Sequence, residues 1–266
     1  MLRTVTTKTL FDSRRSLAGW SVSLVLLVAM YAAIWPSIRD QPSMKDFLDQ
    51  MPEAFRALFT TSGADLSTPV GYVQVELLSF MGPMLLLIYT VTAGASAIAG
   101  EEDRHTLDLV LANPIGRGRL VLEKFAAMLA GTTLLTVVLA VALIVEGVPT
   151  GMRLPAGHVA AAMAHLALLA LVFGALALAI GAATGHPGAS RALPAVLAVA
   201  GYVLNGLGSV VDWLRPLRKL SPFYQFTGHD PLRSGVSLPA VGVSVATVAV
   251  LVAVAVVAFR RRDIAA

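Results

Sequence analysis

The pattern of hydrophobic and polar positions divides the chain into six long apolar segments, joined by shorter charged or Gly/Pro-containing connections. Roughly 20 residues of α-helix cross the hydrocarbon core of a bilayer, and each segment reaches or approaches that length. The predicted spans are about 17–35, 75–99, 120–145, 158–183, 191–211 and 238–259. The pattern therefore predicts an all-α integral membrane protein with six transmembrane helices, in which residues 1–266 form one transmembrane domain.

The first apolar segment, Leu17 to Trp35, follows a basic stretch and is interpreted as a retained helix. A secretory signal peptide has a shorter apolar region that ends at a small-residue cleavage site. Cleavage near Ala32 is a minor alternative. Residues 3–15 are expected to lie on the membrane surface with Val5, Leu10 and Phe11 turned inward.

Two polar connections are expected at the outer surface. Residues 36–70 predict an outer interfacial helix after the first span, which is read as a lid on the lipid head groups in preference to a gate. Its apolar positions in helical register are Met44, Phe47, Leu48, Met51, Phe55, Leu58 and Phe59. Residues 212–237 predict two short interfacial helices. Their expected aromatic anchors are Trp213, Phe223, Tyr224 and Phe226.

Composition supports the membrane class and excludes several others. Hydrophobic residues make up 56% of the chain and charged residues only 14%, whereas soluble proteins carry about a quarter charged residues. The chain has no cysteine, which excludes disulfides and Cys-based metal sites. The net charge of +4 is distributed over helix ends, which does not suit a nucleic-acid partner.

Charge also predicts the topology. With six spans, twelve of the 20 lysines and arginines fall on the side of the termini and eight on the other side. Cytoplasmic loops carry the excess of Lys and Arg. We therefore expect a multi-pass protein of the cell membrane with both termini in the cytoplasm.

Catalytic and ion-coupling motifs are missing from the sequence. No lysine follows a glycine, so there is no Gly-Lys-Ser/Thr of a P-loop, and there is no His-Glu-x-x-His. The acids in the predicted spans lie only near span ends, Glu76 at an outer end and Glu123 at the cytoplasmic start of the third span, which does not favour proton or sodium coupling. His158, His165 and Asn205 are read as packing residues. We expect no cofactor in this chain.

The short charged stretch between the second and third apolar segments, residues 100–124, predicts a short surface helix. Thr106 can cap its N-terminus, and Pro114 ends it. Leu107, Val110 and Leu111 are spaced to form one apolar stripe. This helix either rests on lipid head groups or couples to a cytoplasmic partner by inserting the stripe into a groove.

Two motifs resemble those of ABC-2 type transporter permeases, the membrane subunits of ATP-binding-cassette transporters. The first is G-E-x-x-x-x-T-L-x-L-x-L-x-x-P from Gly100, followed by an Arg and a Lys, and the second is L-S-P-F-x-x-x-x-G-x-x-P-L from Leu220. Both occur in the order found in the family. One departure is His105, which stands where the family often has Gly.

The resemblance implies partners and roles. It implies separate ATPase subunits that hold ATP and Mg, a second permease copy or homologue as a dimer partner, and a transport path lined by helices 2 and 5. Glu101 is implied in a cytoplasmic gate, paired with a local cation such as Arg104, Arg117 or Arg119. The expected partner-binding residues of the coupling helix are Glu101, Thr106, Leu107, Val110, Leu111, Pro114 and Arg117.

The expected function is therefore that of a permease subunit of an exporter for a lipophilic or drug-like substrate, in contact with membrane lipid. The alternative is a non-transporting membrane scaffold or regulator that docks a partner through residues 100–120.

Overall fold

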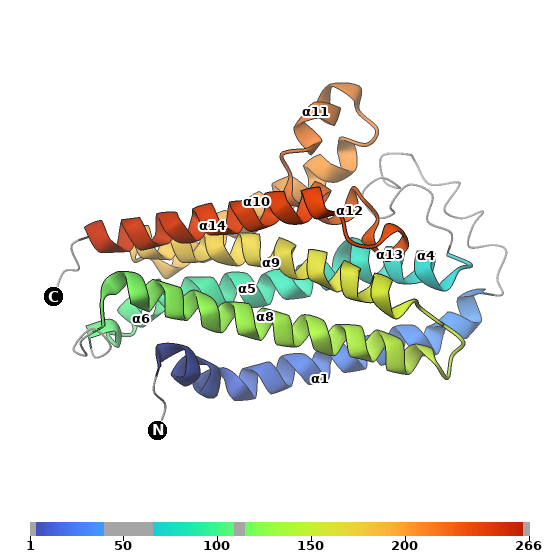
Figure 1. Cartoon of the computed structure of the whole chain (residues 1–266), viewed down its shortest axis with the longest axis horizontal. Helices are drawn as coiled ribbons and strands as arrows, with labels where there is room; N and C mark the ends of the chain where they lie inside the picture. Colours follow the sequence, from blue (N-terminus) through green and yellow to red (C-terminus); the bar gives the residue numbers. More distant parts are fainter. Residues whose placement is uncertain (1–3, 40–65, 109–114, 263–266) are drawn as a thin grey trace.

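The computed structural model of the chain describes residues 4–39, 66–108 and 115–262. It contains six helices or helical runs that are long and apolar enough to cross a membrane, as the sequence predicts. They are α1 (Val5–Arg39), the run Pro69–Ala97, α8 (Arg117–Gly147), α9 (Ala156–Thr184), α10 (Pro187–Leu207) and α14 (Leu238–Arg261). The start of α1 and the end of α14 lie at the same end of the bundle as the short helix α6 (Ala99–Asp103), as Figure 1 shows.

The second span is made of three consecutive pieces. It begins with α4 (Pro69–Val73), earlier than expected, continues as the π-helix η1 (Gln74–Met81) and ends as α5 (Gly82–Ala97). Thr68 caps α4, because its side chain accepts a hydrogen bond from the backbone N–H of Gly71.

The first helix is continuous through the stretch that was expected to lie on the surface. Val5 and Leu10 pack against buried clusters, as expected. Phe11 does not join these clusters and is half-exposed. Its ring is covered instead by the guanidinium of Arg14, 3.7 Å from the ring centroid, one turn further along the helix.

Helix α9 is the central helix of the bundle, and α5, α8, α10 and α14 pack around it. Its closest neighbour is α5. A Cβ atom at Gly94 of α5 would stand 2.2 Å from the backbone oxygen of Gly174 of α9, so only glycine permits this approach. The Ala- and Gly-rich sequence of α9 thus allows close helix packing.

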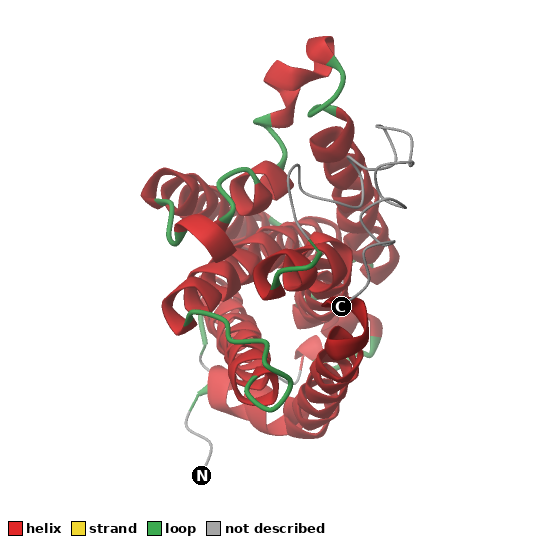
Figure 2. Cartoon of the chain, turned by 90° about the vertical axis from the view of Figure 1, so that its right-hand side faces the viewer, coloured by secondary structure: helices red, strands yellow, loops and turns green. Residues whose placement is uncertain are grey.

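The outer connection folds into η2 (Asp212–Leu214), α11 (Arg215–Arg218), α12 (Pro222–Thr227) and α13 (Pro231–Ser234). The region of α11 rises away from the bundle in both views (Figures 1 and 2). Trp213 is 72% exposed, as an interfacial anchor would be.

Phe223 and Phe226 are buried, so their assignment as membrane anchors is wrong. The ring of Phe223 contacts those of Phe173 and Tyr202, with centroids 5.9 and 5.5 Å away. The cause is Ser221. Its hydroxyl donates to the Gly201 carbonyl at 2.8 Å and accepts from the Phe223 N–H at 3.2 Å, which attaches α12 to α10 and directs Phe223 into the core.

Candidate functional site

The candidate site is the end of the bundle where both termini meet the connection between α5 and α8; we call it the charged end. Ile98 separates α5 from α6, with a φ of −122° that is not helical. Its carbonyl accepts hydrogen bonds from the N–H groups of Glu101 and Glu102, each at 3.0 Å. This tight turn presents two consecutive carboxylates to different neighbours.

The turn after α6 contains a strained residue. His105 has a φ of +53°, in the left-handed region that glycine adopts without steric cost. Glycine, which the ABC-2 pattern that the sequence resembles often has at this position, would adopt this φ without that cost. The N–H and the hydroxyl of Thr106 both donate to the carbonyl of Glu101, at 2.9 and 3.1 Å. The sequence predicts that the Thr106 side chain caps the short helix by accepting a hydrogen bond from a backbone N–H two or three residues further on. These N–H groups lie at and beyond the edge of the described residues, so the capping role stays a prediction.

Glu101 is paired with Lys124 of α8. The predicted cationic partner exists, but Arg104, Arg117 and Arg119 were the wrong candidates. Lys124 lies two turns inside α8, and its side chain is only 8% exposed. The second carboxylate oxygen of Glu101 is buried and has no hydrogen-bond partner among the described residues.

Glu102 makes the second connection, to Arg262 at the end of α14. The backbone oxygen of Arg262 in turn accepts a hydrogen bond from the guanidinium of Arg117, at 2.7 Å. Arg262 therefore joins the start of α8 to α6. Sequence reasoning missed both Glu102 and Arg262, although the acidic pair and the terminal arginines were visible signals.

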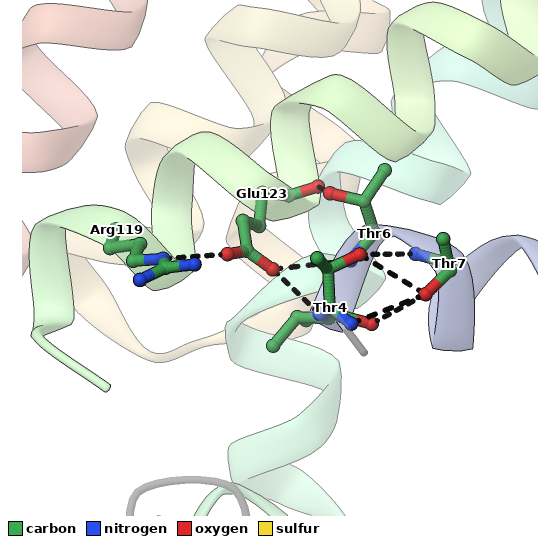
Figure 3. Close-up of polar contacts among 6 residues, drawn as sticks. Thr4, Thr6, Thr7, Arg119 and Glu123 are labelled. Carbon is green, nitrogen blue, oxygen red and sulfur yellow. Dashed lines mark hydrogen bonds and ion pairs between the residues drawn. The ribbon is translucent and has the colours of Figure 1, made fainter. Parts of the chain in front are cut away.

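Glu123 makes the third connection, to the N-terminus of α1 (Figure 3). One of its carboxylate oxygens accepts from the N–H of Val5 at 2.6 Å and from that of Thr6 at 3.4 Å. The other accepts from Arg119 at 2.8 Å, and the Thr6 hydroxyl donates to the Glu123 carbonyl at 3.0 Å. A carboxylate at this position satisfies free N–H groups and suits the positive end of the helix dipole.

Leu107 is buried inside the chain. It is 1% exposed and packs with Ile98, Leu120 and Phe259. Its side chain is thus unavailable to a partner in this conformation, which corrects the expectation that it is a docking anchor. The reason is that α14 and α8 already provide an apolar groove for it. Val110, Leu111 and Pro114 lie outside the described residues.

The other candidate polar residues have structural roles. His165 is buried, and its Nε2 accepts from the Ser237 N–H at 3.2 Å. Asn205 accepts from Arg218 at 2.9 Å and donates to Thr227 at 3.0 Å. Within residues 4–39, 66–108 and 115–262, no group of three or more His, Cys, Asp or Glu is placed to hold a metal ion.

Two of the three carboxylates attach the connection between α5 and α8 to other helices, and the third, on α8 itself, attaches α8 to α1. Glu101 binds α8, Glu102 binds the end of α14, and Glu123 binds the start of α1. Hydrogen bonds to charged groups contribute roughly 1.5–3 kcal/mol each, more than neutral ones. A displacement of the α6 turn would therefore be passed to α8 and α14 directly, and to α1 through α8.

Comparison with known families identifies the chain. The family described as "Multidrug efflux system permease Rv1217c, C-terminal domain" matches residues 9–260. The chain belongs to this family. The match to this multidrug efflux permease family includes all six membrane spans and most of the charged end.

A curated relative is similar over a shorter stretch. The "Probable ABC transporter permease protein NosY" of Stutzerimonas stutzeri is 35% identical over 104 residues. This stretch covers 34% of the present chain and 36% of that protein, so the match spans about a third of the relative's length. The chain is thus a membrane permease with a distant similarity to an ABC transporter permease.

Proposed function

We propose that this efflux permease is the membrane subunit of an ABC-2 type exporter, driven by ATPase subunits that are separate chains. The observation that carries the proposal is the charged end. The connection between α5 and α8 is the element that the ABC-2 motif occupies, and its two ion pairs attach it to α8 and to the end of α14, while Glu123 of α8 holds the start of α1. A partner that moves this connection would move the bundle.

The proposal assigns the charged end to the cytoplasm. Lys and Arg are concentrated at that end, which is the side that the distribution of positive charge predicts. The ATPase would hold ATP and Mg, because this sequence has no Gly-Lys pair for a P-loop.

The partner surface is proposed to include the segment that carries Val110 and Leu111, together with the exposed acid Asp108 beside it. Glu101 and Arg117 would act by holding the connection in place, since both contact other parts of this chain. Leu107 would hold the start of this segment against the bundle, because its side chain is buried in the same cluster as Phe259.

The outward faces of the bundle suit lipid and a second permease. Aliphatic side chains are exposed along α10 and α14, among them Leu193, Val196, Val199, Val250 and Val254. Exposed apolar surface on this scale marks contact with membrane or protein. We propose a dimer in the membrane, with a lipophilic or drug-like substrate as cargo.

The experiment is reconstitution in vesicles with the candidate ATPase. Uptake of a fluorescent drug-like substrate into inside-out vesicles should require both chains and ATP. Pull-down of the ATPase in detergent should fail for Val110→Asp/Leu111→Asp and persist for Asp212→Asn, which lies at the opposite end. Transport driven by a proton gradient without the ATPase would contradict the proposal, and pull-down without any transport would favour the scaffold.

A further inference from the structure

A cavity of about 410 Å³ lies between α1, α5 and α8 and reaches inward from the charged end. Small-molecule sites typically have volumes of roughly 300–1,000 Å³. Along α1 the lining runs from Thr9 to Trp20, which corresponds to about 16 Å of helix. The cavity is therefore large enough and long enough for a molecule with a separate head and body.

The inner part of the cavity is aromatic. Trp20 and Tyr89 meet edge to face, with ring centroids 6.1 Å apart and planes at 72°. The hydroxyl of Tyr89 lies against α8 at Gly131, where an added Cβ would be 1.9 Å from it. This contact fixes the tyrosine ring in position. Indole and phenol faces attract cations and stack on flat rings.

The outer part of the cavity is charged and offers unused acceptors. Lys124 is already paired with Glu101, yet the second oxygen of Glu101 has no hydrogen-bond partner among the described residues. Asp12 lines the same opening and makes no ion pair within the described part of the chain. A buried acceptor without a donor is costly, and a ligand that brings a donor would remove that cost.

Between these parts the lining is small and hydroxylated. Ser13 and Ser16 of α1 and Thr92 and Ser96 of α5 line this part of the cavity. Such side chains leave room for a flat ring and provide hydrogen bonds along its edge. Arg104 is the one cation at the opening that is not paired in the described residues, and its exposed side chain is long enough to extend into water.

We propose that this cavity binds an aromatic organic cation. The positive group would lie between Asp12 and the free oxygen of Glu101, and the rings would lie against Trp20 and Tyr89. In the proposed exporter, and resting on that function, the cavity would be where the substrate first binds from the cytoplasmic side.

The test uses ethidium as the probe and the purified full-length chain in detergent, without any ATPase. Binding followed by fluorescence should be saturable. Asp12→Asn and Trp20→Ala should each weaken it about tenfold, the loss expected for one charge-assisted or cation–π contact. The matched controls Asp212→Asn and Trp213→Ala, both highly exposed at the opposite end, should bind as the unmodified chain does.

Two results would overturn the proposal. One is equal loss, or no loss, in the cavity variants and their controls. The other is equally tight binding of the anionic dye 8-anilinonaphthalene-1-sulfonate with the same dependence on Asp12 and Trp20. If a cavity variant fails to fold, photolabelling of the unmodified chain with the azide derivative of ethidium decides: labels on α1, α5 or α8 support the site, and labels elsewhere refute it.

The outcome is separable from that of the proposed function. Because binding is measured without ATP or an ATPase, a positive result stands even if reconstituted vesicles transport nothing. Conversely, ATP-dependent export that is unaffected by Asp12→Asn and Trp20→Ala would leave the exporter intact and refute the cavity as the place where the substrate first binds.

Discussion

Breaking the ion pair between Lys124 and Glu101 should destabilise the charged end more than any other single charge removal. In Lys124→Met the carboxylate of Glu101, whose side chain is only 16% exposed, keeps its charge and loses its partner. Removing one member of a buried pair costs about 3–5 kcal/mol. Because this pair is not fully buried, we expect the lower end, about 3 kcal/mol.

The assay is thermal unfolding in detergent, monitored by circular dichroism. A change of 1 kcal/mol moves the melting temperature by about 2–4 °C in a chain of this size class, so Lys124→Met should melt about 6–12 °C lower. The double variant Glu101→Gln/Lys124→Met removes both charges and should recover most of the loss.

The control is Arg119→Met, which removes a cation from the same helix. Arg119 is 68% exposed in its pair with Glu123, and exposed pairs contribute at most about 1 kcal/mol. Two results would refute the reasoning: a melting temperature of Lys124→Met no lower than that of Arg119→Met, or a double variant no more stable than the single one.

Four further predictions use the same preparation. Gly94→Ala should lower the melting temperature, because the new methyl group would collide with the α9 backbone. The control Gly157→Ala, which has open space around the added methyl group, should leave the melting temperature unchanged, and equal effects of the two variants would contradict the close contact. His105→Gly should stabilise the chain by about 1 kcal/mol by relieving its positive φ, and a loss of stability would show that the imidazole is needed. Glu123→Gln should speed amide exchange in the first turn of α1 and leave α14 unchanged; unchanged exchange in α1 would refute the cap. Burial raises the pKa of Asp230 above its ordinary 3.8, and a nearby arginine partly offsets this shift, so the folded state keeps the proton to a higher pH than the unfolded state does. The free energy of unfolding should therefore fall as the pH rises from about 4 through the raised pKa. Asp230→Asn should abolish this pH dependence, and a dependence that persists in the variant would assign it to another group.

The sequence predicted the number and order of the spans correctly, because a bilayer demands about 20 apolar residues per helix and little else. It did not predict the helix ends. α8 begins at Arg117, three residues before the expected apolar start, since arginines continue a helix as readily as leucines do. Hydropathy locates the bilayer, whereas hydrogen bonding determines where a helix ends.

The site was predicted less completely, for a reason that Glu101 illustrates. Its need for a cation followed from its place at a helix end, and two of the candidates considered, Arg117 and Arg119, lie on the correct helix, α8. The actual partner, Lys124, is on the same helix but further from its start, and the sequence does not show which face of α8 is turned toward Glu101. Leu107 shows the same limitation, because an apolar stripe in the sequence does not tell whether the groove belongs to a partner or to the same chain.

The contact between Glu123 and the start of α1 has a consequence for the order of synthesis. The two partners are 118 residues apart, so α1 emerges from the ribosome long before the carboxylate that completes its first turn exists. Until α8 has been inserted, the N–H groups of Val5 and Thr6 can be satisfied only by water or lipid head groups. The first turn of α1 therefore reaches its final position only after the third span is in the membrane, and a chain truncated before Glu123 should leave that turn accessible.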